Sequence, residues 1–140
     1  MAITSATLTV TISESLKLNG AHYGNTTTKT IGSCGEGIQK VVSVPHTTSV
    51  RMISNLDTVA KRDNFVYFRI KNADATNFIT LHLEGAVTGT VSFKLLAGES
   101  YESTCNEIWD YTANAWDKIY RINATSDTAT CDVEFFYVSK

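Results

Sequence analysis

The side chains of this sequence best suited to chemistry are three histidines, but their spacing does not fit a catalytic site. His22, His46 and His82 are far apart in the chain, and none lies in a recognisable motif. Nucleophilic catalysis requires a serine or cysteine beside a base that a third group orients. We therefore expect exposed, non-catalytic histidines and no enzymatic activity.

A second group that could take part in catalysis is a set of carboxylates within residues 99–117. Glycoside hydrolysis needs two carboxylates that face each other across a cleft, whereas acidic residues in a loop are usually solvated. A hydrolase is therefore the least favoured alternative. The five carboxylates are Glu99, Glu102, Glu107, Asp110 and Asp117.

Metal and cofactor motifs are not evident in the sequence. Cys34, Cys105 and Cys131 show no CxxC or Cys/His spacing, so we expect buried, reduced thiols rather than a zinc site or a disulfide framework. The glycines of residues 32–37 are not followed by the lysine and helix of a phosphate-binding loop, and no calcium-loop motif occurs. We predict no cofactor and no metal.

Aromatic side chains cluster in the same irregular stretch as the carboxylates. Residues 99–117 contain Tyr101, Trp109, Tyr111 and Trp116, including both tryptophans of the chain. Trp and Tyr are enriched in interface hot spots, and their rings also stack on sugars. We predict that these four residues contact a partner. The alternatives are a glycan platform and, for Trp109 and Trp116, a cap on the end of the fold.

The elements that must position these side chains are strands, because apolar residues alternate along most of the chain. Residues two apart share one face of a strand, so each alternating run describes a sheet with one buried face. We predict an all-β fold, an antiparallel β-sandwich or jelly roll of about eight or nine strands with one irregular aromatic loop. Clear examples are Leu8/Val10/Ile12, Val66/Phe68/Ile70, Ile79/Leu81/Leu83, Val91/Phe93/Leu95 and Val133/Phe135/Tyr137.

Turn residues divide the chain into expected elements within one domain, residues 1–140. Asn19-Gly20 predicts a hairpin turn, since both residue types tolerate positive φ. We expect 21–23 to be a short connection, 32–37 to be flexible, 57–63 to contain a helical turn, and 107–111 to form a short helix. Residues 65–71 and 78–84 are predicted to pair as a hairpin. The other expected strands are 7–13, 26–31, 39–44, 49–56, 90–96, 119–123 and 130–138.

Composition and charge exclude several function classes. Net charge is −2 and the twelve basic residues are scattered, whereas nucleic-acid binding requires clustered positive charge. No long apolar segment predicts a membrane span, and the N-terminal residues predict no signal peptide. Only 19% of residues are charged. The threonine-rich surface suits packing against neighbours, although threonine also simply favours strands.

Three blocks of the sequence resemble small structural proteins of tailed bacteriophage virions. The resemblance is one of overall pattern along most of the chain. The blocks are Leu8 to Gly20 followed by Tyr23-Gly24-Asn25-Thr26, then Val66 to Asp74 continuing through Ile79 to Leu83, and finally Ala129 to Val138.

The resemblance implies a capsid decoration or cement protein. Such a protein is a non-enzymatic β-sandwich that binds the outside of the assembled capsid, in contact with the major capsid protein and with itself as a dimer or trimer. The implied location is the capsid surface of a virion assembled in the host cytoplasm. A tail, head-fibre or baseplate component would fit the same pattern, and a carbohydrate-binding module using the aromatic loop is the alternative from another class.

A second contact surface is predicted at the N-terminus. The first five residues carry no charged side chain and directly precede a strand, so they could form an arm that lies along a capsid or adds to the edge of a neighbouring sheet. These residues are Met1, Ala2, Ile3, Thr4 and Ser5.

Overall fold

The computed structural model describes residues 5–54 and 65–140, with only the backbone of Ile53 and Ser54 described. The chain divides into two compact units, Met1–Gly35 and Glu36–Lys140. The described residues contain strands and no helix. The sandwich expected over residues 1–140 therefore comprises the second unit, and the first unit is a separate two-stranded ribbon. The expected helical turn at 57–63 lies outside the described residues.

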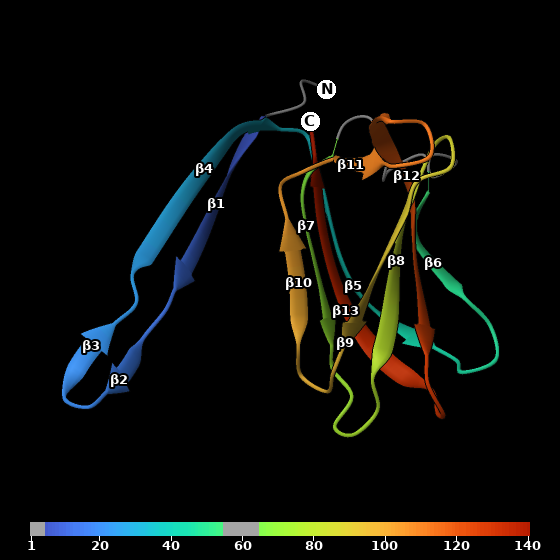
Figure 1. Cartoon of the computed structure of the whole chain (residues 1–140). Helices are drawn as coiled ribbons and strands as arrows, with labels where there is room; N and C mark the ends of the chain where they lie inside the picture. Colours follow the sequence, from blue (N-terminus) through green and yellow to red (C-terminus); the bar gives the residue numbers. More distant parts are fainter. Residues whose placement is uncertain (1–4, 55–64) are drawn as a thin grey trace. The chain divides into compact units, whose positions relative to one another are not determined.

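The first unit is a ribbon of two consecutive strand pairs (Figure 1). Strand β1 (Ala6–Ser13) pairs with β4 (Thr26–Cys34), and β2 (Leu16–Leu18) pairs with β3 (Ala21–Tyr23), all antiparallel. The Asn19-Gly20 turn between β2 and β3 is confirmed, with φ values of 51° and 81°. A backbone hydrogen bond of 2.9 Å from Glu14 N to Asn25 O links the two strand pairs.

Two expectations for this unit are wrong. Residues 21–23, expected to be a connection, form β3 because the tight Asn-Gly turn brings them back onto β2 in register. The expected flexible stretch 32–37 belongs largely to strands, since β4 continues to Cys34 and β5 (Glu36–Val44) begins two residues later. Glycine in a strand weakens it without preventing ladder hydrogen bonds.

The second unit is the predicted β-sandwich, with two antiparallel sheets. One sheet has the order β10-β7-β13-β5, in which β7 (Phe65–Asn72) and β13 (Cys131–Ser139) are central and β10 (Ser100–Ser103) is an edge strand. The other has the order β11-β12-β8-β9, with β6 (Val50–Ser54) also paired to β12. Its strands are β8 (Ile79–Gly85), β9 (Thr90–Leu95), β11 (Glu107–Asp110) and β12 (Ala115–Ser126).

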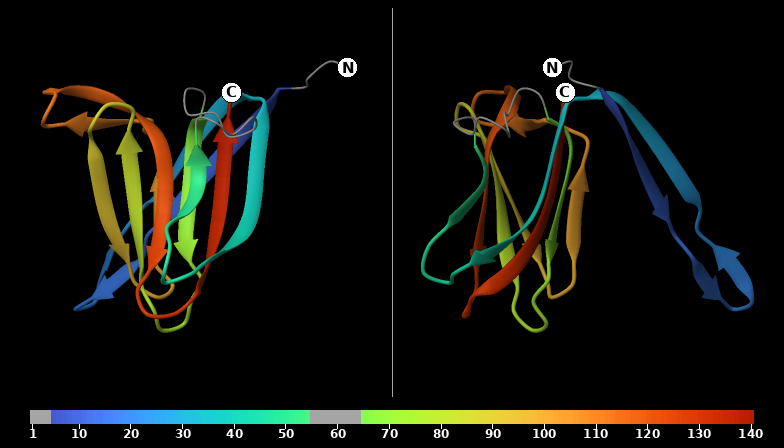
Figure 2. Two further views of the ribbon diagram at one scale, coloured as in Figure 1. Left: turned by 90° about the vertical axis from the view of Figure 1, so that its right-hand side faces the viewer. Right: turned by 180° about the vertical axis from the view of Figure 1, so that it is seen from behind.

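The core lies between the two sheets, as the alternation requires (Figure 2). On β13 the inward residues Val133, Phe135 and Tyr137 are 0–1% exposed. They face buried residues of the opposite sheet such as Leu81 and Ile122. Burial of each large apolar side chain contributes about 1.5–3 kcal/mol, so this layer dominates the stability of the sandwich.

The predicted hairpin of residues 65–71 and 78–84 is wrong. Strands β7 and β8 belong to different sheets, so the chain crosses from one layer to the other between them. The buried Asn72 side chain holds this crossing: its Nδ2 donates to the carbonyl oxygens of Asn77 (2.8 Å) and Leu95 (3.1 Å). Its Oδ1 accepts from the backbone N–H of Asp74 at 3.0 Å.

Candidate functional site

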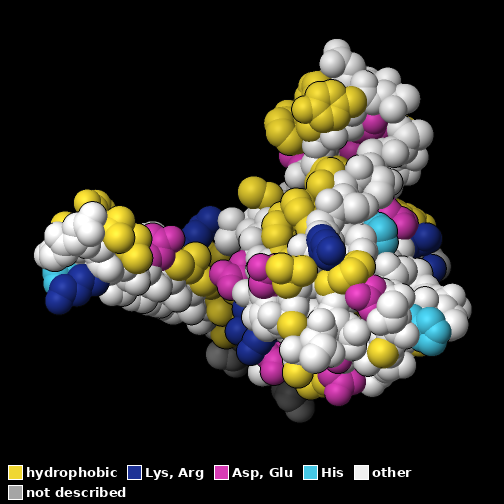
Figure 3. All heavy atoms as spheres, turned by 60° about the horizontal axis from the view of Figure 1, so that its bottom comes forward, with side chains coloured by type: hydrophobic (Ala, Val, Ile, Leu, Met, Phe, Trp, Pro, Cys, Tyr) yellow, Lys and Arg dark blue, Asp and Glu magenta, His cyan; other side chains and the backbone are white. Residues whose placement is uncertain are grey.

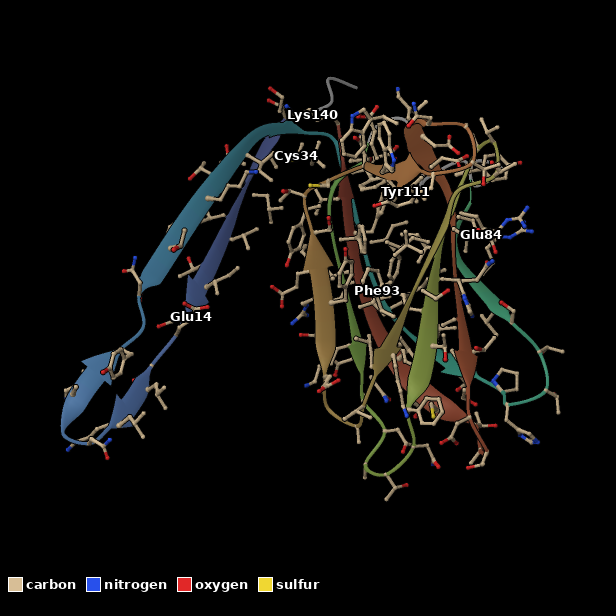
Figure 4. All side chains as sticks on the ribbon, viewed as in Figure 1. Glu14, Cys34, Glu84, Phe93, Tyr111 and Lys140 are labelled. Carbon is tan, nitrogen blue, oxygen red and sulfur yellow. The ribbon has the colours of Figure 1, made fainter. Side chains whose placement is uncertain are left out.

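The four aromatic residues predicted as contacts separate into two places. Tyr101, on edge strand β10, is half-buried and stacks on Phe93 of β9, with ring centroids 4.6 Å apart, and it also lies 5.8 Å from the Phe68 ring. These contacts join the two sheets at their open side, where Figure 4 labels Phe93. Burial raises the pKa of the Tyr101 phenol. Tyr101 is thus set apart from Trp109, Tyr111 and Trp116.

The remaining three aromatics lie on a hairpin formed by β11 and the start of β12, which projects beyond the other strands (Figure 2, left). The helix expected at 107–111 is wrong. Trp109 and Trp116 face each other across the two strands, with ring centroids 5.3 Å apart and an interplanar angle of 78°. Cross-strand aromatic pairs of this edge-to-face kind stabilise a hairpin, which explains why a strand forms.

The two faces of this hairpin differ in chemistry. Trp109 and Trp116 share one face, whereas Ile108, Asp110 and Asp117 share the other, because facing and alternate residues lie on the same side. Ile108 and both carboxylates are buried. Trp116 is 67% exposed and does not cap the sandwich core, whereas Trp109 is half-buried.

The buried carboxylates attach the hairpin to the loop between β8 and β9. Asp117 accepts hydrogen bonds from the backbone N–H groups of Ala86 (3.0 Å) and Val87 (2.8 Å). A Cβ at Gly85 would lie 2.1 Å from the Asp117 Oδ2, so this close approach requires glycine. Asp110 accepts a short hydrogen bond from the Thr88 hydroxyl.

Asp110 also closes the hairpin's own turn. It accepts from the backbone N–H groups of Thr112 (2.8 Å) and Ala113 (3.2 Å). The hydrogen bond from Thr88, together with these two, holds the pKa of Asp110 below its ordinary value of 3.8. The loop thus fixed carries Val87, which is 69% exposed, and the turn of the hairpin carries the exposed Tyr111. Hydrophobic side chains gather on a projection at the top of Figure 3, and Figure 4 labels Tyr111.

Four of the five carboxylates proposed for a hydrolase accept hydrogen bonds from local structure, and the fifth, Glu107, is exposed on β11. Besides Asp110 and Asp117, Glu99 accepts from the backbone N–H of Leu96 at 2.8 Å, and Glu102 accepts from the Ser100 hydroxyl at 3.3 Å. A catalytic pair must face a substrate instead. Their hydrogen bonds are those of turn and loop stabilisation.

His82 contacts two hydroxyl side chains that were not predicted from the sequence. Its Nδ1 lies 2.8 Å from the Ser92 Oγ and its Nε2 lies 3.4 Å from the Thr125 Oγ1, across β9 and β12. A catalytic Ser–His pair needs an orienting carboxylate on the second ring nitrogen, and here that position holds a hydroxyl. Ser92 lies directly opposite His82 in the strand register, whereas on β12 the residue opposite His82 is Asn123 and Thr125 lies two residues farther along, an arrangement that only the strand pairing reveals.

Two of the three cysteines are buried as expected. Cys34 and Cys131 are buried and Cys105 is exposed, so the expectation is wrong for Cys105. Burial raises the pKa of the Cys131 thiol. Within the described residues, no group of three or more His, Cys, Asp or Glu side chains lies close enough to hold a metal ion. No helix in this part of the chain has the length and apolarity that a membrane span requires.

The ribbon carries a row of apolar side chains on β1. Leu8, Val10 and Ile12 alternate along one face of β1, with Ile31 opposite Leu8. Leu8, Val10 and Ile31 are half-buried. Ile12 is 48% exposed, and the β2–β3 pair carries further exposed apolar side chains, Leu16 (55%), Leu18 (54%) and Tyr23 (58%).

The other face of the ribbon is a ladder of hydroxyls. Thr11 and Thr28 lie opposite each other with their Oγ1 atoms 3.4 Å apart, and the Ser13 Oγ lies 3.0 Å from the Thr26 Oγ1. β1 is therefore amphipathic, whereas on β4 Lys29 and Thr27 lie opposite Val10 and Ile12 on the apolar side of the ribbon. Of the N-terminal arm predicted to make contacts, Met1, Ala2, Ile3 and Thr4 lie outside the described residues, and Ser5 is exposed just before β1.

No family model, curated protein or solved structure matches this chain.

Proposed function

We propose that this protein is a non-enzymatic structural component of a tailed-phage virion that binds the outside of the assembled capsid and stabilises it. The observation that carries the proposal is the exposed apolar face of the ribbon. A two-stranded ribbon is at best marginally stable in water, and exposed apolar surface of this kind is typical of interaction sites. The resemblance of the sequence blocks to virion proteins supports the choice of partner.

The second unit supports the proposal by its rigidity. Its inward side chains form one continuous core between two sheets, and the projecting hairpin is attached by the Asp110 and Asp117 carboxylates. A decoration protein works by mass action, because a subunit that binds only the assembled shell stabilises that state. A rigid body with a separate apolar ribbon suits this task, since little ordering entropy is lost on binding.

The test is co-sedimentation with capsid shells of the phage that carries the gene. We expect binding to assembled shells and not to unassembled major capsid protein, with an increase in the temperature at which shells rupture. Leu16→Lys should lower occupancy at least tenfold, because it places a charge among the exposed apolar side chains of the ribbon. Lys17→Glu, on the opposite ribbon face, is the control. Equal binding by Leu16→Lys and the parent would contradict the proposal.

A tail, head-fibre or baseplate location uses the same surfaces and is distinguished by copy number. Hundreds of copies per particle would support decoration of the capsid. Six or twelve copies would support the tail alternative. Quantitative mass spectrometry of purified particles measures this number directly.

Glycan binding is the second candidate function, favoured by the exposed rings of the β11–β12 hairpin. Tyr111 is 88% exposed and Trp116 is 67% exposed. A sugar could stack on either ring. Binding on a glycan array that is lost in Trp116→Ala would support this candidate, with Trp109→Ala as the test of whether the hairpin must be intact.

A further inference from the structure

The free edge of β1 differs from the other open strand edges in the described part of the chain. β1 pairs with β4 on one side, and no described strand pairs with its other side. Unpaired edges invite association with another strand, and proteins usually prevent this with charged residues, proline or a short edge. β1 has eight residues without a charge or a proline.

The other described edge strands of four or more residues all contain a charged residue, and of the two three-residue strands β2 contains Lys17 whereas β3 contains none. β4, the partner of β1, contains Lys29, and the edge strands of the sandwich contain charged residues as well. The charged residues are Glu36 and Lys40 in β5, Arg51 in β6, Lys94 in β9, Glu102 in β10, and Glu107 and Asp110 in β11. Among the described edge strands of four or more residues, β1 is therefore the one without charge.

The residue order in β1 suits pairing with itself. Residues 7–13 read Thr-Leu-Thr-Val-Thr-Ile-Ser, so hydroxyl and apolar side chains alternate symmetrically about Val10. In an antiparallel pair, facing residues lie on the same side of the sheet. A two-fold axis at Val10 would place Leu8 opposite the second copy's Ile12 and Thr9 opposite its Thr11. No like charges would meet, as they would if β4 paired with itself at Lys29.

We propose that two copies of this chain associate through β1, antiparallel about a two-fold axis at Val10. The product is a four-stranded sheet of order β4-β1-β1-β4, with an isologous interface of the kind that closes as a dimer. The apolar rows of the two β1 strands then form one continuous strip at the centre of one face, flanked by Thr27, Lys29 and Ile31 of each β4, and the ladders of hydroxyls form the other face. The backbone hydrogen bonds of four strands stabilise a ribbon that two strands leave marginal.

The axis position follows from the register of the ribbon. An axis at Val10 uses residues 7–13 in full and leaves Ala6 unpaired, where the β1–β4 register is irregular. An axis at Thr11 would pair only residues 9–13. An axis between two residues would place apolar side chains opposite hydroxyls, because a shift of one residue reverses the faces.

The first test is the mass of the free protein in solution, which does not depend on capsid binding. We expect a dimer by sedimentation equilibrium. Thr9→Lys should raise the dissociation constant at least tenfold, since it charges the β1 edge. Thr30→Lys is the matched control: Thr30 lies directly opposite Thr9 in the ribbon, and the same charge then sits on β4. A monomer at every concentration, or equal effects of the two variants, would overturn the proposal.

The second test is a cross-link that reports the register. In a Cys105→Ser background, which removes the exposed native thiol, Val10→Cys should form a covalent dimer on mild oxidation. Facing residues of an antiparallel pair have Cα atoms about 4.5–5.5 Å apart, within disulfide range. Thr30→Cys should remain monomeric on a denaturing gel. Cross-linking of Thr30→Cys alone, or of neither variant, would contradict the β1 pairing, whatever the result with capsid shells.

Discussion

The strands of the ribbon and of the sandwich show the same alternation of apolar and polar residues, but the exposure of their apolar side chains differs. Leu8, Val10 and Ile12 alternate as regularly as Phe68 and Ile70 do. In the sandwich the apolar face is covered by a second sheet, and Ile70 is 0% exposed. In the ribbon, Ile12 is 48% exposed.

The difference shows what alternation specifies. Alternation predicts which face of a strand is apolar, but it does not predict whether that face is buried by the same chain or by a partner. The sandwich obtains its cover from strands that are distant in sequence. For the ribbon we infer that the cover comes from outside the chain.

The largest expected contrast comes from the same substitution in both regions. Ile70→Ala should lower the free energy of unfolding by about 2–5 kcal/mol, because it leaves a cavity in a packed core. Ile12→Ala should change it by less than about 0.5 kcal/mol, as surface substitutions do. Urea denaturation followed by far-ultraviolet circular dichroism measures both. Similar losses for the two variants would remove the distinction between the regions.

A smaller contrast is expected between two asparagines. Asn72→Asp should cost about 3 kcal/mol at neutral pH, because a buried carboxylate would replace the Nδ2 donor that faces two carbonyl oxygens. Asn25→Asp in the ribbon should be nearly neutral. There the side-chain oxygen accepts from the Thr26 N–H at 2.8 Å in an exposed turn, and a carboxylate does the same. Thermal unfolding at pH 7 provides the comparison.

The smallest expected effect is the weakening at acid pH of the contacts that attach the two-stranded β11–β12 hairpin to the sandwich. The pKa of Asp110 is below its ordinary value of 3.8, so its stabilising contribution is present above that pH and is lost as the pH falls through the lower folded value. We expect the attachment to weaken only below about pH 3.8. Both tryptophans lie on this hairpin, so tryptophan fluorescence reports it.

Thr88→Val is the variant that isolates this contact. Since the Thr88 hydroxyl is the largest cause of the lowered pKa, its removal should move the fluorescence midpoint to higher pH. Thr112→Val is the control, because Asp110 binds the backbone N–H of that residue. An unchanged midpoint in Thr88→Val would show that the loop does not hold the hairpin through this hydroxyl.

Much of the secondary structure could be predicted from the sequence, because alternation and turn residues act locally. The strands around Phe68, Leu81, Phe93 and Phe135 and the Asn19-Gly20 turn were predicted on these grounds. The pairing of β7 with β13 rather than β8 could not be predicted. It joins segments far apart in the chain, and so does the hydrogen bond from Asn72 to the carbonyl oxygen of Leu95 at the crossing between the sheets.

The candidate contact surfaces were predicted only in part. The aromatic residues predicted a contact surface within residues 107–116. The carboxylates of the same stretch were predicted to be solvated side chains of a loop. The attachment by Asp117 requires the glycine at 85, and Gly89 lies in tight contact with Asp110; both glycines are remote from the hairpin in sequence. The alternation of β1 was visible, whereas its free edge appears only once every other strand has been paired.

The place of β13 has a consequence for how the molecule is built. It lies between β5 and β7, and about ninety residues of chain separate β5 from it. During synthesis, the edges of β5 and β7 that pair with β13 stay unpaired until this segment has left the ribosome. Pairing between strands so far apart in the chain is slow, on the order of milliseconds to seconds, so this sheet is completed late in the folding of each newly made chain.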